Sequence, residues 1–586
     1  MECRNLHLLK KLGYINGEWV NAKSNSVFPV INPADDKVIA EIPDMDATDA
    51  KIAVDSATNA FKTWKDTSAK ERSSILRKWF DICQKNSDHL ADIITAEAGK
   101  PLAESKGEVA YGNSFLEWFA DTARHINGEV IPSPWPNKQI IVTRQPLGVV
   151  SIITPWNFPF AMITRKVGAL MAAGCTCVIK PAEDTPLTAL AAVQLAEEAG
   201  VPKGVINVVT SSRKNAPAVG SVLCEDPNVG CISFTGSTHV GKILYGMAAK
   251  GIKRVALELG GNAPFIVFSS ADINHAVEQA MLAKFRNNGQ ACVGANRFLI
   301  HEEIFDKFVD CFKHKISQKC ILGPGHKEGV TCGPLINMEQ IKKVSGLVND
   351  AVKKGAKVKI GGQVAKEIGE KFYESTVLVD VKPDMEIYRE EIFGPVAVCL
   401  KFKTENEALE IANSTRSGLA AYVFTSDLGQ AFRMSRQLEF GMVAINDGVL
   451  SAAEPPFGGI KESGIGREGS KHGAEEYTDL KIQEVDDSFF EKFGSILKQV
   501  SQKAALEEST PLAPLKEVEE QDGEQKEITE VGATSITRDS DSGNETLLDT
   551  DSEPEDAEKM DFYVEAMGWN GQLSIVDYSY RRFCLS

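Results

Sequence analysis

The sequence predicts an α/β protein built on a doubly wound parallel sheet. From Pro146 onward, apolar runs of strand length alternate with runs that have helical spacing. The strand-length runs, such as 148–154 (GVVSIIT) and 175–180 (CTCVIK), are apolar almost throughout, as in strands covered on both faces. A second series of the same kind, from about 258 to 447, predicts a second α/β domain.

The flanking segments differ in pattern. Residues 13–45 alternate short β-like runs with Asn-Gly and Asn-Pro turns, and residues 46–127 have strong helical spacing. Residues 138–145 form a strand candidate, and residues 472–485 end in another. Between them we expect strands in VINVV, CISFTG, FIVF, RFLI, AVCLKF, YVFT and MVAIN, with helices near 215–225 and over 272–288.

The negative charge is concentrated near the C-terminus. Of the formal net charge of −17, most lies in residues 501–560, which hold 18 acidic and 5 basic residues and no aromatic residue. Such a segment cannot bury enough apolar surface to fold, so we expect disorder from about Phe493, with an aromatic docking peptide at 560–583. The rest of the chain has no basic field, which argues against nucleic acid as a partner.

Cysteine usage and hydropathy bound the compartment. The twelve cysteines are scattered without C-x-x-C pairs, which favours a reducing compartment and predicts no metal site. No apolar run approaches about 18 residues, so no membrane helix is expected. The start lacks a signal-peptide core and an Arg-rich leader, which predicts a cytoplasmic protein, with mitochondria as the alternative.

The stretch 285–296 (FRNNGQACVGAN) is the candidate nucleophile loop. Cys292 lies among small residues that leave a thiol reachable and let backbone N–H groups point at a bound group. The alternative is a buried structural thiol, which is common for free cysteine.

Two further motifs supply a base and an amide donor. Glu258 follows a hydrophobic strand and precedes a Gly-Gly pair, so desolvation should raise its pKa toward that of a useful base. Asn157, in IITPWNFP, offers an amide to an oxyanion. The alternatives are a solvated surface charge for Glu258 and a turn or helix N-cap for Asn157.

Two strand ends suggest a phosphate and ribose site. GSTHVGK (236–242) follows a strand and opens a helix, where backbone amides hold phosphate, but Ile243 stands where a nucleoside triphosphatase needs Ser or Thr. Lys180 and Glu183 end another strand and suit an adenosine ribose, and Glu183 would repel a 2′-phosphate. This favours NAD over NADP. The alternative is a surface ion pair.

Seven motifs together resemble the NAD(P)-dependent aldehyde dehydrogenase superfamily over about residues 10–485. In the family's order they are ITPWNFP, KPAEDTP, FTGSTHVG, LELGG, GQAC, EEIFGP and PFGGIKESGIGREG. Within it, AKERSSILRKW, AMITRKVGAL, KFRNNGQAC and GVLSAAEPPFGG are most similar to the branch that oxidises succinate semialdehyde to succinate in GABA degradation. The alternatives are another semialdehyde, such as glutarate semialdehyde, and a non-catalytic paralogue with a partner-binding tail.

The resemblance implies roles for individual residues. Cys292 is the nucleophile, Glu258 the general base, and Asn157 with the Cys292 amide the oxyanion hole. The residues implied for cofactor binding are Trp156, Lys180, Pro181, Ala182, Glu183, Gly236, Ser237, Gly241, Glu391 and Phe393. Arg165, Arg286 and Ser451 would bind the distal carboxylate of the aldehyde, for which guanidinium groups are suited. Surface salt bridges are the alternative for both arginines.

The resemblance also implies the domain plan. The NAD-binding domain would span 10–129 and 146–257, the catalytic domain 258–471, and bridging strands 130–145 and 472–485 would join subunits of a homodimer or homotetramer. Residues 486–586 form the acidic tail, whose partner is open. Gly294 stands where some members carry a second cysteine, so a local disulfide switch is not expected. Phe160 is bulkier than the residue expected there and would narrow the substrate tunnel.

Overall fold

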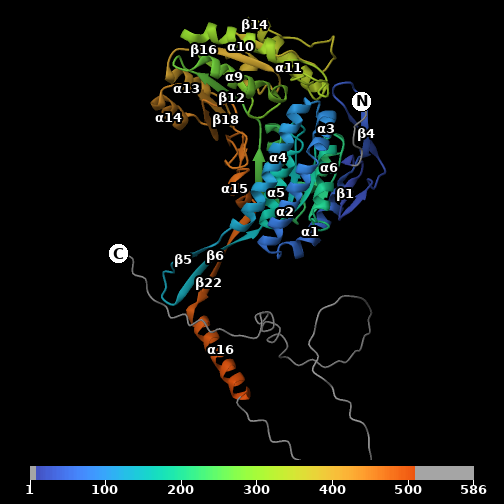
Figure 1. The fold of residues 1–586 in the computed structure, drawn as a ribbon, viewed down its shortest axis with the longest axis vertical. Helices are drawn as coiled ribbons and strands as arrows, with labels where there is room; N and C mark the ends of the chain where they lie inside the picture. Colours follow the sequence, from blue (N-terminus) through green and yellow to red (C-terminus); the bar gives the residue numbers. More distant parts are fainter. Residues whose placement is uncertain (1–7, 509–586) are drawn as a thin grey trace, which may run out of the picture. The chain divides into compact units, whose positions relative to one another are not determined.

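The structure is a computed structural model that describes residues 8–508. Two large sheets with their helices make up most of this part of the chain (Figure 1). The first sheet has the strand order β2 (Glu18–Val20), β1 (Gly13–Ile15), β9 (Ile206–Val208), β8 (Thr176–Lys180), β7 (Val149–Ile153), β10 (Val229–Thr235), β11 (Arg254–Glu258) and β21 (Gly464–Ile465).

The predicted doubly wound topology is confirmed in this sheet. Strands β9, β8, β7, β10 and β11 are mutually parallel, and β1 and β21 add antiparallel edges. Among the parallel strands the chain forms β7 first, then β8 and β9 on one side of it, and then returns to form β10 on the other side of β7. This reversal creates a switch point between β7 and its neighbours, where open α/β sheets bind ligands at the strands' carboxyl ends.

Helices cover the first sheet. The helical spacing predicted for 46–127 is confirmed, because the segment forms α1 (Ala47–Trp64), α2 (Ala69–Lys85), α3 (Ser87–Ala98), α4 (Leu102–Thr122) and the short η2 (Ala123–His125). The crossover helices are α5 (Ala161–Ala173), α6 (Leu187–Glu198), α7 (Ala216–Glu225) and α8 (Thr238–Ala249). Helices α2, α4 and α5 pack on one another around the buried Trp79, Phe115 and Phe119 (Figure 1).

The second sheet has the order β14 (Lys357–Ile360), β15 (Thr376–Val379), β16 (Val396–Phe402), β13 (Ala295–His301), β12 (Ala263–Val267), β18 (Ala420–Phe424) and β19 (Met442–Ile445). All neighbours are parallel except β14 and β15. Its helices are α9 (Ile273–Phe285), η3 (Arg286–Gly289), η4 (Glu302–Ile304), α10 (Phe305–Lys319), α11 (Met338–Lys353), α12 (Glu386–Arg389), α13 (Glu405–Asn413) and α14 (Leu428–Gln437).

The helix predicted over 272–288 ends three residues early, at Phe285. Asn287 and Asn288 both have φ of 52°, in the left-handed region, which ends a right-handed helix. The side-chain amides of both residues hold backbone carbonyls elsewhere, which stabilises this conformation. The break turns the chain toward Cys292.

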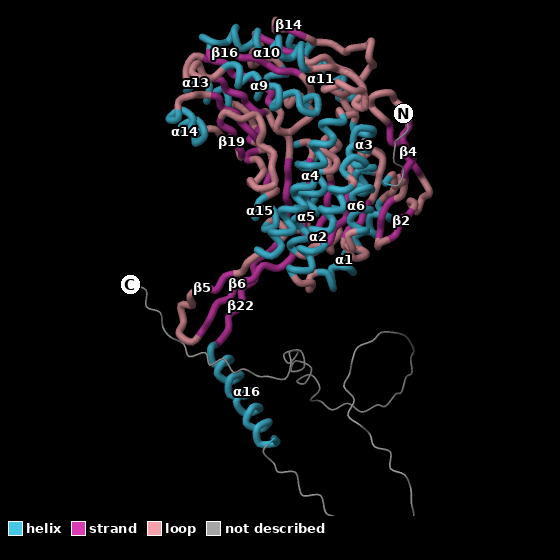
Figure 2. Tube along the Cα trace, in the orientation of Figure 1, coloured by secondary structure: helices cyan, strands magenta, loops and turns pink. Residues whose placement is uncertain are grey.

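The smaller sheets include the strands expected near 138–145 and 472–485. β5 (Glu129–Ile131), β6 (Lys138–Pro146) and β22 (Thr478–Asp486) form an antiparallel sheet, in which β6 and β22 run side by side (Figure 2). The remaining elements are the pair β3 (Val27–Ile31) and β4 (Val38–Pro43), the pair β17 (Ser417–Gly418) and β20 (Ile460–Lys461), and helix α15 (Ser470–Glu475).

The start of the predicted tail is corrected by the structure. Asp486 is the last residue of β22, and helix α16 spans Asp487–Glu508, so loss of regular structure from about Phe493 was wrong for this part. The charged and apolar residues of 487–508 suffice for a helix, although the composition farther on is acidic. The rest of the acidic segment and the proposed docking peptide lie outside the described residues.

Candidate active site

A large cavity lies at the switch point of the first sheet. Its volume is about 1040 Å³, and it is lined at the ends of β7, β8 and β10 by Ile153, Lys180 and Thr235. Residues of the second series, including Glu391 and Phe393, close it. The cavity is large enough for a dinucleotide-sized ligand, which fits the cofactor implied by the sequence.

The N-terminus of α8 borders this cavity. Ser237 caps the helix, its hydroxyl accepting from the Val240 N–H at 3.3 Å, and Gly236 and Ser237 both line the cavity. Gly241 does not line it. A Cβ at position 241 would lie 2.4 Å from Leu259 Cδ2, so this glycine allows close packing of the helix rather than contact with a ligand.

Of the pair Lys180 and Glu183 at the end of β8, the lysine is buried and the glutamate is partly exposed. Lys180 is buried and its Nζ lies 3.9 Å from Glu183 Oε2 and 3.1 Å from the Pro181 carbonyl oxygen, to which it donates. Burial lowers the pKa of Lys180. Lys180, Ala182 and Glu183 line the cavity, whereas Pro181 does not, so the pair is not an ordinary surface ion pair.

Trp156, Glu391 and Phe393 also line the large cavity. The rings of Trp156 and Phe393 meet edge to face with centroids 5.4 Å apart. Glu391 Oε1 accepts from the Gly261 N–H at 2.9 Å, and burial raises the pKa of Glu391. The EEIFGP motif therefore meets the Gly-Gly pair that follows Glu258.

Cys292 lies between two cavities. It lines the large cavity and also a small one of about 30 Å³ on its other side. Burial raises the pKa of its thiol to about 12, while Arg165 and the Val293 N–H, which donates to the sulfur, act to lower it. The thiol is thus reachable from both sides, as the small residues around it predicted.

Asn157 is held against the nucleophile loop. Its Nδ2 donates to the Gln290 carbonyl at 3.1 Å, and its own carbonyl accepts from Lys100 Nζ and Asn287 Nδ2, each at 2.9 Å. Asn157 lines the same cavity as Cys292. It does not cap α5, whose N-cap is Phe160, so the capping alternative was wrong.

Glu258 ends β11 and is buried, so the solvated-charge alternative was wrong. Desolvation, followed by the charge of Glu468, raises its pKa well above the ordinary value, and Arg165 opposes this. Among the described residues its Oε2 has no hydrogen-bond partner. An unpaired buried carboxyl of raised pKa is suited to take a proton from water.

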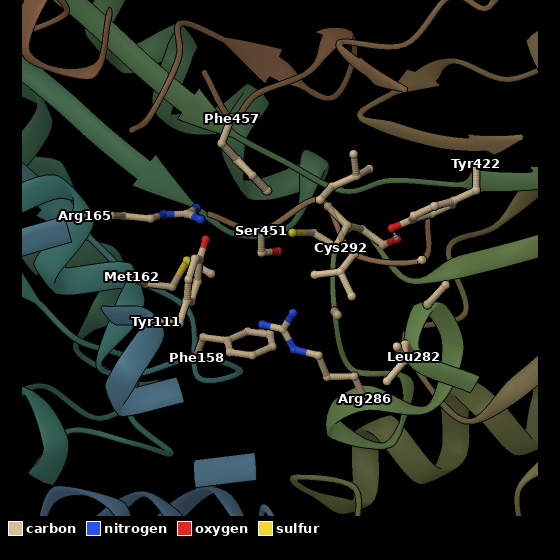
Figure 3. A pocket seen from close by; sticks show the side chains of 16 residues that line it. Tyr111, Phe158, Met162, Arg165, Leu282, Arg286, Cys292, Tyr422, Ser451 and Phe457 are labelled. Atoms are coloured by element: carbon tan, nitrogen blue, oxygen red, sulfur yellow. Dashed lines mark hydrogen bonds between the residues drawn. The ribbon is translucent and has the colours of Figure 1, made fainter. Parts of the chain in front are cut away.

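The small cavity beside the thiol brings the three predicted carboxylate ligands together. Arg165, Arg286 and Ser451 all line it with Cys292. Figure 3 shows the Cys292 sulfur, the Ser451 hydroxyl and the two guanidinium groups directed toward one central space. The guanidinium of Arg286 lies over the ring of Phe158, 4.9 Å from its centroid, which fixes its direction.

Arg165 is buried and paired, not on a helix surface. It forms an ion pair with Glu468, which also binds Lys166. Burial acts to lower the pKa of Arg165, but Glu468 together with Tyr111 and Glu258 outweighs burial, so the pKa is raised. Nη2 of Arg165 has no hydrogen-bond partner within the described residues, so one donor remains for a ligand.

Sequence reasoning missed several residues of this site. Glu468 lies in the quoted motif GIGREG, where a carboxylate between glycines was the available signal. Tyr111, whose hydroxyl points toward Arg165, and the rings of Phe158 and Phe457 line the small cavity (Figure 3). Aromatic residues in helices and loops resemble ordinary core residues, so their sequence context carried no signal.

The expected narrowing by Phe160 was wrong. This ring is fully buried in the first core and does not line the cavity. It packs against Gly112, where a Cβ would lie 2.4 Å from Phe160 Cδ1. The glycine on α4 makes the room that the bulky side chain needs.

No group of three or more His, Cys, Asp and Glu side chains is placed to hold a metal ion within 8–508. In the same range no helix combines the length and apolar character needed to cross a bilayer.

The fold and site define an aldehyde dehydrogenase, and the chain belongs to the aldehyde dehydrogenase family, whose model matches residues 19–483. Among curated relatives, the mitochondrial succinate-semialdehyde dehydrogenase of Homo sapiens is 51% identical over 474 residues, 81% of this chain and 88% of that protein. Glutarate-semialdehyde dehydrogenase of Pseudomonas aeruginosa is 49% identical over 481 residues, 82% of this chain and 99% of the relative.

Solved structures agree with this assignment. An NADP-dependent enzyme of E. coli is 47% identical with a TM-score of 0.81, covering 83% of this chain and 100% of that one. Betaine aldehyde dehydrogenase of Staphylococcus aureus in complex with NAD+ is 35% identical with a TM-score of 0.79, covering 82% of this chain and 95% of the other.

Proposed function

We propose that the protein oxidises succinate semialdehyde to succinate with NAD. The observation that carries this proposal is the arrangement around the small cavity, in which Arg165, Arg286 and Ser451 face the space beside the Cys292 thiol. A thiol suits the aldehyde carbon, and guanidinium groups suit a carboxylate at the other end of a short substrate. The relatives that act on succinate and glutarate semialdehydes support the same substrate class.

The chain's own residues supply the covalent chemistry. The Cys292 thiolate adds to the aldehyde carbon, and the resulting oxyanion accepts hydrogen bonds from Asn157 and a backbone amide. Bound NAD supplies the chemistry that removes a hydride from this carbon, which leaves a thioester on Cys292. Glu258 then takes a proton from water, which attacks the thioester and releases the acid and the thiol.

The cavity of about 1040 Å³ is the proposed cofactor site. The α8 N-terminus with Gly236 and Ser237 would hold the pyrophosphate, and Lys180 and Glu183 the adenosine ribose. Trp156, Glu391 and Phe393 would hold the nicotinamide end. NAD is favoured over NADP because the Glu183 carboxylate would repel a 2′-phosphate. Pro181 would act through its backbone carbonyl, which accepts from Lys180, and Gly241 by letting α8 pack closely against Leu259.

We infer the assembly of the protein from exposed apolar side chains and its compartment from its free thiols. We infer a homodimer or homotetramer joined through β5, β6 and β22, since Val130, Leu480 and Ile482 on these strands are 63–70% exposed. We infer a reducing compartment, the cytoplasm or alternatively the mitochondrial matrix, since ten cysteines of the described chain are free thiols.

A substrate panel tests the proposal. Purified protein is assayed by NADH absorbance with succinate semialdehyde, glutarate semialdehyde and an uncharged aldehyde, each with NAD or NADP. We expect the highest kcat/KM with succinate semialdehyde and NAD, and none in Cys292→Ala. Arg286→Ala should raise KM for the carboxylate-bearing aldehydes by about tenfold or more and leave the uncharged aldehyde nearly unchanged. Equal losses on all substrates would overturn the assignment of Arg286.

A further inference from the structure

Two cysteines outside the nucleophile loop lie side by side next to the substrate cavity. Cys320 directly follows α10, and Cys332 lies twelve residues farther along, after a loop. Both residues line a third cavity of about 380 Å³, and their thiols are close enough to shift each other's pKa. This cavity shares Tyr111, Arg286 and Ser451 with the small cavity beside Cys292.

The backbone between the two cysteines is already closed into a loop. The Thr331 and Cys332 N–H groups both donate to the Ile321 carbonyl, at 2.9 and 3.0 Å, and Gly323 N–H donates to the Cys332 carbonyl at 3.0 Å. These bonds, with the β-bridge between Leu322 and Cys332, hold the segment directly after Cys320 at strand-pairing distance from Cys332. A disulfide requires such proximity of the two backbones, because its Cα atoms lie no more than about 7 Å apart.

The two thiols differ in reactivity. Cys320 is partly exposed, and its interaction with the Cys332 thiol lowers the pKa of Cys320. Cys332 is 2% exposed, and its pKa is raised well above the ordinary value, first by its interaction with the Cys320 thiol and then by burial. An accessible thiol of lowered pKa beside a second thiol is the usual arrangement of an oxidisable cysteine and its resolving partner.

We propose that Cys320 and Cys332 are a peroxide-sensitive dithiol that forms a reversible disulfide at the wall of the substrate site. The Cys320 thiolate attacks one oxygen of a hydroperoxide and breaks the O–O bond, giving a sulfenic acid and, after protonation, water or an alcohol. The Cys332 sulfur then attacks the Cys320 sulfur and displaces hydroxide, which leaves as water with the Cys332 proton. Two thiols are oxidised and one peroxide is reduced.

The disulfide would affect the active site through hydrogen bonds that join the segment after Cys332 to the loop before Cys292. Gly333, next to Cys332, accepts at its carbonyl from Asn288 Nδ2 at 2.8 Å. Ile336 N–H donates to Gln290 Oε1 at 3.0 Å, and Gln290 accepts the amide of Asn157. A disulfide that draws Cys332 toward Cys320 would therefore shift the segment at Gly333 and Ile336 that holds the loop before Cys292. It would also shift the cavity wall that includes Arg286.

The first test is chemical and independent of activity. The full chain with Cys292→Ala, so that the nucleophile consumes no peroxide, is reduced and treated with hydrogen peroxide. It is then alkylated, digested and mapped by mass spectrometry. We expect a peptide pair joined through Cys320 and Cys332 that dithiothreitol separates. The matched control is Cys311→Ser, a partly exposed free cysteine on α10, the helix that Cys320 follows, and it should leave the cross-link intact. Alkylation of both Cys320 and Cys332 after peroxide would overturn the proposal.

The second test rests on the proposed function. Oxidised protein with native Cys292 is assayed with succinate semialdehyde, and kcat/KM should fall by about tenfold and recover with dithiothreitol. The fall should be absent in Cys320→Ser and present in Cys311→Ser. An equal fall in Cys320→Ser would place the effect on another thiol and overturn the switch. Inactivity of reduced protein with every aldehyde would overturn the proposed function, while the cross-link result would stand.

Discussion

Glu468 bonds to both Arg165 and Lys166, two consecutive cations of helix α5, inside the protein beside the Cys292 cavity. The three side chains are 6% exposed or less. Glu468 thus neutralises charge that would otherwise be buried without a partner, and it directs Arg165 toward the cavity. The pairing lowers the pKa of Glu468 despite its burial.

Glu468→Leu should destabilise the protein by about 3–5 kcal/mol, because it leaves two buried cations without their carboxylate. The measurement is guanidinium denaturation monitored by fluorescence. Glu117→Ala, which removes an exposed partner of Arg77, is the control and should cost less than about 1 kcal/mol. Similar losses in the two variants would contradict the role assigned to burial.

Glu258 should give the turnover rate a pH dependence. Its pKa is raised in the folded protein, and only the ionised carboxylate can accept a proton, so kcat should rise with pH through that raised pKa. In Glu258→Gln the rise of kcat with pH should disappear, and the steady-state rate should fall by about 10²–10⁴-fold. The initial burst of NADH should remain, because NADH forms before the hydrolysis step that Glu258 assists. Stopped-flow measurements over a pH series separate the NADH burst from the steady-state rate. The exposed Glu439→Gln serves as control, and loss of the burst in Glu258→Gln would assign Glu258 to an earlier step.

Gly261→Ala should impair catalysis through the backbone of Cys292, the proposed nucleophile. A Cβ at position 261 would lie 2.3 Å from the Cys292 carbonyl oxygen, so Cys292 must move. A misplacement of the thiol by about 1 Å is expected to cost about 10²-fold in kcat. Gly246→Ala on α8 meets no atom within 4 Å and should stabilise the helix by about 1 kcal/mol with activity unchanged. Unchanged kcat in Gly261→Ala would show that the loop adapts.

Glu97 should make stability fall as pH rises. Burial raises its pKa to about 8, so the folded state keeps a proton that the unfolded chain releases near pH 4.5. The stabilisation is present at low pH and is lost as pH rises to about 8, with a slope of up to about 1.4 kcal/mol per pH unit. Glu97→Gln should flatten this part of the curve. Denaturation midpoints of both proteins at several pH values provide the measurement, and parallel curves would refute the assignment.

The sequence by itself determined the α/β fold and the order of the motifs, and it predicted which residues carry the chemistry. Continuous apolar runs such as 148–154, bounded by turn signals, are typical of buried strands, and the local contexts of Cys292, Glu258 and Asn157 predict their roles. These features depend on neighbours within a few residues, so local periodicity and residue type suffice to find them.

Only the tertiary structure decided which side chains meet. Lys166 and Glu468 are 302 positions apart, and no local pattern predicts that they bind. The same holds for Gly112, which gives Phe160 its place in the core, and for the dithiol of Cys320 and Cys332 beside Arg286. Packing of distant elements fixes such contacts, and it directs each side chain into a cavity or away from it.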